Sequence, residues 1–237
     1  MTVNHFIHIV PKLVKYNIKI IFAGKFIWFI LAALVFLLFV MFQSAWNKDT
    51  DISEKLIYGL LLFPSMLLIF YPSVFGIQND EDARILELLF GIPNYKYKVW
   101  AVRLLIIYIA IFFILILFSY LTVILLYPIN PVLMSFQLMF PILFYGNLAF
   151  MFSTITRSGN GTAVIMIVIT IALIFLQNMQ GDNYWNIILN PFAIPRNMLP
   201  VIWESIILKN RIFLLVGSII WMMTGLMNLQ KREKFLG

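Results

Sequence analysis

The feature that most constrains the fold is a run of 53 residues, Leu104 to Thr156, that contains no Asp, Glu, Lys or Arg. A helix needs only about 20 residues to cross the apolar core of a bilayer. The run is therefore too long for one membrane span and suits two. A short segment at 127–131 separates the two spans, because its residues Pro128 and Pro131 interrupt helical hydrogen bonding. A chain with such a segment is predicted to be a membrane protein.

Four further charge-free stretches bring the number of predicted spans to six. The composition agrees, since 62% of the residues are hydrophobic and 11% are charged, against about half and about a quarter in a typical globular protein. This composition excludes a soluble enzyme, a nucleic-acid-binding domain and a disordered tail. We predict an all-α membrane protein with one transmembrane domain over 1–237. Its six transmembrane helices are expected at 26–46, 56–78, 104–126, 132–155, 160–179 and 212–229.

The positions of the basic residues predict the orientation of these spans. With the N-terminus on the cytoplasmic side, 12 of the 17 Lys and Arg residues fall on that side, and the formal net charge of +7 lies entirely there. The N and C termini are then both cytoplasmic, and no cleaved signal peptide is expected. The anionic lipids of that face account for the basic character, so no nucleic-acid partner is needed. The predicted location is the bacterial cytoplasmic (inner) membrane, as a multi-pass protein.

The segment 4–24, before the first span, carries Lys12, Lys15 and Lys19 on one helical stripe among apolar residues. This pattern is typical of an amphipathic helix that lies on the inner membrane surface, with the lysines reaching lipid headgroups. A simple positively charged anchor explains the same residues equally well. Both interpretations stay open from the sequence.

A second cytoplasmic segment, 80–91, is predicted to form a short helix between spans two and three. Asn79 is a candidate N-cap, acidic residues fill the first turn, and Gly91 and Pro93 end the helix. At about 18 Å it is too short to cross a membrane. It has a charged face and an apolar face, which either lipid headgroups or a soluble partner protein must cover. The candidate contact residues are Glu81, Arg84, Ile85, Glu87, Leu88, Leu89 and Pro93.

The outer segment 182–210 contains two tryptophans and three prolines among apolar and charged residues. It is too interrupted to cross the membrane and too apolar for a solvated loop. We expect short helices that dip into the outer interface, with the tryptophans at headgroup level, or a re-entrant pair of helices.

The sequence lacks the motifs of several catalytic mechanisms. Without cysteine, disulfides and thiolate chemistry are excluded. The single Gly-Lys pair, at Gly24, lacks the remaining residues of a phosphate-binding loop, so the chain is not expected to hydrolyse ATP. His5 and His8, the two histidines, give too weak a signal for a metal site. The spans as predicted hold no charged residue, which disfavours ion-coupled transport. An enzyme is therefore not expected.

Polar side chains within the spans are few and uncharged. Most are expected to form hydrogen bonds between helices, and some to line a path for an amphipathic substrate. These residues are Tyr58, Ser65, Tyr71, Ser119, Tyr120, Gln137, Asn147, Thr170, Gln177, Asn178 and Thr224.

These features resemble the permease subunits of type-2 ATP-binding-cassette (ABC) exporters. The clearest similarity is an acidic residue, an apolar-Glu-apolar core, a proline and a basic residue that opens the third span: Glu81, Leu86-Glu87-Leu88, Pro93 and Arg103. Weaker similarities lie at 152–158 and 189–192. The sequence departs from the family pattern at Ile85, where a small hydroxyl residue is common, and at Arg103, where Lys is usual.

The resemblance implies a dimer of permeases, formed by two copies or with a related chain, docked on separate ABC ATP-binding subunits. Those subunits would bind ATP and Mg, and this chain would hold no cofactor. The segment 80–91 would be the coupling helix that contacts them, and the substrate would be an amphipathic lipid, peptide, glycan or drug. The alternatives are a non-transporting membrane assembly or immunity factor, and a haem-export permease.

Overall fold

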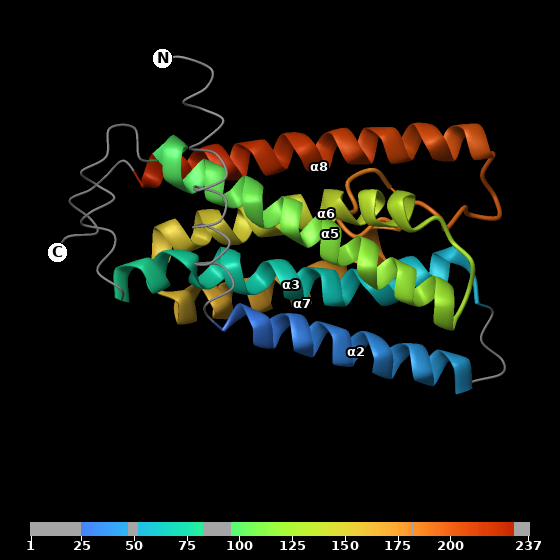
Figure 1. Cartoon of the computed structure of the whole chain (residues 1–237). Helices are drawn as coiled ribbons and strands as arrows, with labels where there is room; N and C mark the ends of the chain where they lie inside the picture. Colours follow the sequence, from blue (N-terminus) through green and yellow to red (C-terminus); the bar gives the residue numbers. More distant parts are fainter. Residues whose placement is uncertain (1–24, 47–51, 83–95, 182, 230–237) are drawn as a thin grey trace, which may run out of the picture.

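The computed structural model describes residues 25–46, 52–82, 96–181 and 183–229 (Figure 1). The described residues form α-helices and one short π-helical segment, and they contain no strand. The helices are α2 (Phe26–Trp46), α3 (Glu54–Asp82), α5 (Val102–Leu125), α6 (Pro131–Thr156), α7 (Gly159–Gln180) and α8 (Pro200–Asn228), with the π-helical η1 (Lys96–Ala101) leading directly into α5.

Six of these helices are long and apolar enough to cross a membrane. This confirms an all-α protein with six candidate spans, and therefore a multi-pass membrane protein. The bounds of α2 coincide with the prediction of 26–46, and α6 differs from 132–155 by one residue at each end. Charge-free stretches locate these helices well because a charged side chain facing lipid is costly, so such residues collect near the span ends.

The predicted break at 127–131 is confirmed. Helix α5 ends at Leu125, and α6 begins at Pro131, whose missing N–H falls in the first turn of the helix, where no intrahelical partner exists. Asn130 caps this turn, because its side-chain oxygen accepts a hydrogen bond from the backbone N–H of Leu133 at 3.1 Å. A proline and a capping amide thus turn one long apolar run into two antiparallel helices.

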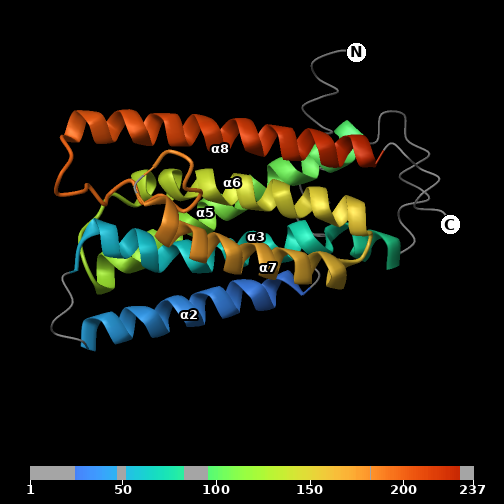
Figure 2. The same ribbon diagram turned by 180° about the vertical axis from the view of Figure 1, so that it is seen from behind.

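Helix α6 lies at the centre of the bundle, where it packs against α3, α5, α7 and α8 (Figures 1 and 2). A chain of hydrogen bonds joins three helices at its middle. The Tyr108 hydroxyl donates to Asn147 Oδ1 at 2.8 Å, and Asn147 Nδ2 donates to Ser218 Oγ at 2.7 Å. Close approach of α6 and α8 depends on Gly225, since a Cβ there would lie 2.7 Å from the Phe150 ring.

Several polar span residues form the expected hydrogen bonds between helices. Thr170 is bonded to Tyr145 across α6 and α7 at 2.8 Å, and Ser119 to Ser135 across α5 and α6 at 3.1 Å. Others do not: Ser65 and Thr224 bond to carbonyls of their own helices, and Tyr120 is half exposed. The side chains of Gln177 and Asn178 lie outside the described part of the chain.

The prediction for 182–210 was wrong over its second half. Residues 200–210 belong to α8, which begins at Pro200, twelve residues before the predicted span, while the described residues 183–199 form turns rather than short helices. The charge criterion ended the span too early. Glu204 and Lys209 are exposed on the surface of α8, and Arg211 is buried among polar groups, so none of the three interrupts the helix.

The predicted helix boundary at Asn79 was also wrong, because α3 continues without a break to Asp82. Instead of capping a new helix, the Asn79 side chain donates a hydrogen bond to the Tyr71 hydroxyl at 3.1 Å, two turns earlier on α3. The rest of the predicted helix at 80–91, and the interfacial helix at 4–24, lie outside the described residues.

Candidate functional site

Most of the residues that the sequence analysis singled out fall outside the described part of the chain. The backbone of Glu81 lies in the last turn of α3. The other predicted contacts and the predicted membrane anchors remain predictions: Arg84, Ile85, Glu87, Leu88, Leu89, Pro93, Lys12, Lys15 and Lys19.

The structure instead reveals a buried polar cluster around Arg211 on α8. Arg211 is only 5% exposed. Its Nε donates to Gln137 Oε1 of α6 at 3.0 Å, and its Nη1 donates to Asn210 Oδ1 at 2.9 Å. The guanidinium also lies over the Phe140 ring, 5.2 Å from its centroid. A cation that lies between the predicted outer segment 182–210 and the predicted sixth span is thus inside the bundle.

The Arg211 cluster contains neutral partners only. In the described residues Arg211 forms no ion pair with a carboxylate, and its Nη2 atom makes no hydrogen bond. Tyr58 of α3, 1% exposed, interacts electrostatically with the guanidinium, although its hydroxyl also makes no geometrically acceptable hydrogen bond. A buried charge held by amide, hydroxyl and ring groups is expensive. An ionisable residue inside a membrane bundle is therefore the first candidate for function.

The same cluster fastens the segment 183–199 to the bundle. Asn210 Nδ2 donates to the carbonyl oxygens of Tyr184 and Asn186 at 2.9 and 2.8 Å. About two turns earlier on α8, Trp203 Nε1 donates to the Pro191 carbonyl at 2.9 Å, and its side chain is buried. Asn210 therefore holds Arg211 through its carbonyl and the outer segment through its amide nitrogen.

Helix α3 contacts the same outer segment. Asn190 Nδ2 donates to the Lys55 carbonyl, in the first turn of α3, at 2.8 Å. The Tyr58 ring packs 6.0 Å from the Phe192 ring. The segment 183–199 is thus attached to both α3 and α8, the two longest helices, at 29 residues each.

A second buried arginine, Arg103, lies in the first turn of α5. It is 6% exposed, and its guanidinium is 4.7 Å from the centroid of the Trp100 ring in η1. Trp100 in turn lies 6.1 Å from the Phe150 ring of α6. The basic residue that carries part of the family resemblance is therefore packed where α5 begins, near the C-terminal part of α6.

The sequence contains a signal for the Arg211 cluster that the analysis missed. Pro200 is a strong helix start, since proline suits the first helical turn, and counting from it places Asn210 and Arg211 three turns inside a helix. Treating every Arg as a span end obscured this. The residues that surround Arg211 come from distant parts of the chain, Gln137 on α6 and Tyr58 on α3. Sequence spacing does not predict such tertiary contacts.

Comparison of the chain with protein-family models, with curated proteins and with solved structures found no match. The chain is therefore characterised by its six apolar helices and by the buried Arg211 cluster at one end of the bundle.

Proposed function

We propose that the chain is the membrane-spanning permease subunit of an ATP-driven ABC exporter that moves an amphipathic substrate. The observation that carries the proposal is the position of the two helix ends that flank the segment between spans two and three. The end of α3 and the start of η1 lie at the same end of the bundle as the start of α2 and the end of α8 (Figure 1). With the orientation that the basic residues favour, this is the cytoplasmic end, where an ATP-binding subunit would dock.

In this proposal, helix α3 connects the ATPase contact at one end of the bundle with the Arg211 cluster at the other. It is 29 residues long, which corresponds to about 43 Å. Its inner end leads into the segment 80–91, and its outer end carries Tyr58 beside Arg211 and the Lys55 carbonyl bonded to Asn190. Pro64 and Pro72 each remove a helical hydrogen bond and permit bending. A displacement at the inner end of α3 would thus reach the outer segment 183–199.

In this mechanism the Arg211 cluster, which we call the Arg211 latch, holds the segment 183–199 against the bundle. Closure of the ATP-binding subunits would displace α3 relative to α8, and Tyr58 would move relative to Arg211. Because Arg211 is held by neutral acceptors and by no described carboxylate, separating the two helices does not require breaking an ion pair. Release of the segment 183–199 would then open a path for the substrate toward the outer leaflet.

The experiment compares two double variants of the full chain, each co-expressed with any ATP-binding subunit that a gene next to its own encodes. Arg84→Glu with Leu89→Asp is expected to abolish co-purification and substrate-stimulated ATP hydrolysis, because it reverses a charge and adds one on the apolar face. Arg84→Lys with Leu89→Met, the matched control, should retain both. Normal binding and hydrolysis with the charge-reversing pair would contradict the proposal. Absence of any neighbouring ATP-binding subunit would favour an assembly or immunity factor instead.

A further inference from the structure

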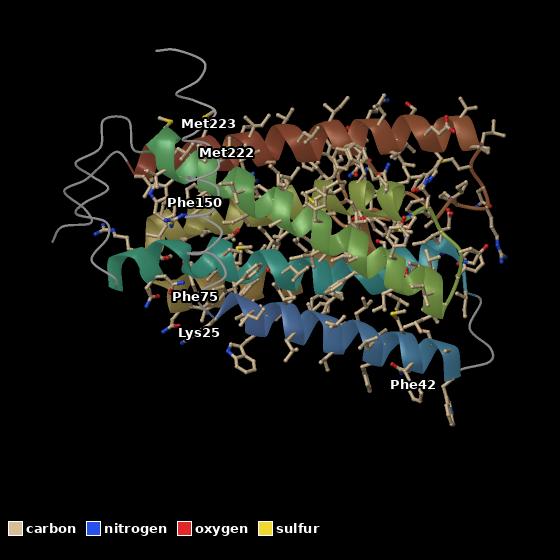
Figure 3. All side chains as sticks on the ribbon, in the orientation of Figure 1. Lys25, Phe42, Phe75, Phe150, Met222 and Met223 are labelled. Carbon is tan, nitrogen blue, oxygen red and sulfur yellow. The ribbon has the colours of Figure 1, made fainter. Side chains whose placement is uncertain are left out.

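A pocket of about 420 Å³ opens at the end of the bundle opposite the Arg211 cluster. Residues at the start of α2, on α3 and at the start of α7 line it, and α2 and α7 both pack on α3 (Figure 2). This volume lies within the range of small-ligand sites, about 300–1,000 Å³. Its lining residues are Lys25, Phe29, Tyr71, Phe75, Gln78, Asn79 and Asn160. Figure 3 labels Lys25 and Phe75 at this end.

The polar groups of the pocket include one cation and several hydrogen-bond donors. Lys25 is exposed and forms no ion pair with the described residues. The Gln78 oxygen accepts a hydrogen bond from the backbone N–H of Gly159 at 2.6 Å, which fixes the side chain and leaves its NH₂ group for a ligand. The Tyr71 hydroxyl accepts from Asn79, so its own proton is also available. An ammonium with neutral donors around it suits a phosphate that carries a single charge.

Three aromatic rings form the apolar part of the same pocket. The Tyr71 ring lies 4.8 Å from that of Phe29 and 5.5 Å from that of Phe75, between centroids. Clusters of aromatic rings attract organic ammonium groups through their π faces. With Lys25 to bind a phosphate and aromatic rings to bind an ammonium, the pocket suits a ligand that carries one negative and one positive charge.

Apolar surface continues from the pocket along the two side helices. On α7, Val164 and Val168 follow Asn160 at four-residue intervals and are 62% and 60% exposed. On α2, Phe36 follows Phe29 by two turns and is also exposed. In a membrane these stripes face acyl chains, which can run along them from a headgroup in the pocket.

We propose that this pocket binds the headgroup of a zwitterionic, amino-bearing phospholipid. The phosphate lies at Lys25 and the Gln78 amide, the ammonium lies against the rings of Phe29, Tyr71 and Phe75, and the acyl chains follow α2 and α7. The site lies at the opposite end of the bundle from the Arg211 cluster. It does not rest on the proposed function, since it requires only the described helices and a membrane.

Native mass spectrometry of the full chain, without any ATPase, tests the site. Short-chain phosphatidylethanolamine is titrated in detergent beside phosphatidylglycerol, the matching diacylglycerol and inorganic phosphate. We expect one phosphatidylethanolamine per chain, bound at least tenfold more tightly than diacylglycerol and not displaced by millimolar phosphate. Equal binding of diacylglycerol, displacement by inorganic phosphate, or tighter binding of phosphatidylglycerol would overturn the proposal.

Two variants locate the binding in this pocket. Lys25→Gln is expected to weaken binding about tenfold, the loss of one charge-assisted contact. Asn160→Trp keeps every charge and fills the pocket mouth at the exposed start of α7, so it is expected to weaken binding by at least as much. Lys209→Gln, which removes an exposed lysine from α8, is the matched control and should leave binding unchanged. Unchanged affinity in both pocket variants would overturn the assignment.

Discussion

Arg211 and Lys25, at opposite ends of the bundle, differ in how far their charges are buried. At one end Arg211 is 5% exposed and is surrounded by Gln137, Asn210, Tyr58 and an aromatic ring. At the other end Lys25 is exposed at the mouth of a pocket of about 420 Å³ and has no described ion partner. An arginine suits the buried site, because its guanidinium presents five hydrogen-bond donors in a plane. A lysine suits the exposed site, because its ammonium is a compact point charge.

This difference in burial predicts how a mutation at each site changes the stability of the protein. Groups around Arg211 have exchanged water for protein partners, so removing one partner leaves a buried donor or charge unsatisfied. Lys25 keeps its access to water, so its removal leaves nothing unsatisfied. The Arg211 cluster is therefore expected to control stability and the attachment of 183–199, and Lys25 to control ligand affinity alone.

The largest loss of stability is expected for Asn210→Ala. The substitution removes one acceptor from the Arg211 guanidinium and two donors to the backbone of 183–199. The unfolding free energy should fall by about 3 kcal/mol, measured by denaturant titration in detergent. Proteolysis between residues 183 and 199 should also accelerate.

A residue on the same helix supplies the control for this variant. Thr224 is exposed, and its hydroxyl donates to the Ile220 carbonyl of α8 itself, so Thr224→Ala removes a polar group without touching another element. It should leave both stability and proteolysis near their original values. If Asn210→Ala behaved like Thr224→Ala, Arg211 and the outer segment would not be held in the way described.

A smaller effect is expected for Asn147→Leu, at the middle of the bundle. Asn147 accepts from Tyr108 and donates to Ser218, so its loss breaks the connection among α5, α6 and α8. Both partners are neutral, and hydrogen bonds between membrane helices contribute about 0.6 kcal/mol each on average. We expect a loss of about 1 kcal/mol in the same titration. A loss as large as that of Asn210→Ala would show that the charge on Arg211 adds nothing.

The sequence predicted the helices far better than the sites. Six spans followed from charge-free stretches, and the α5–α6 turn followed from Pro128 and Pro131, because these signals are local in the chain. The errors came from treating charge as a boundary. Arg211 is tolerated inside α8 because Gln137, 74 residues away, accepts its hydrogen bond. No local pattern contains that information.

The pocket beside Lys25 was also not predictable from the sequence. Gln78 and Gly159 are 81 residues apart, and their hydrogen bond exists only because the end of α3 meets the start of α7. Asn79 was read as a helix cap on its residue type, whereas the structure continues the helix and pairs the side chain with Tyr71. Capping propensity is a weak preference, and a continuous apolar helix packed on its neighbours overrides it.

The smallest change in stability is expected for Lys25→Gln, the variant that weakens phospholipid binding under the proposal for the pocket beside Lys25. The Lys25 carbonyl, which accepts from the Trp28 N–H at 3.1 Å, is unaffected by the substitution. In lipid-free detergent the unfolding free energy should change by less than about 0.5 kcal/mol, as for other surface substitutions. With bound phospholipid, the original chain should gain stability that the variant does not, because a ligand stabilises only the state that binds it. A large loss for Lys25→Gln without lipid would mean that the lysine is a structural partner like Arg211, and the contrast between the two ends would fail.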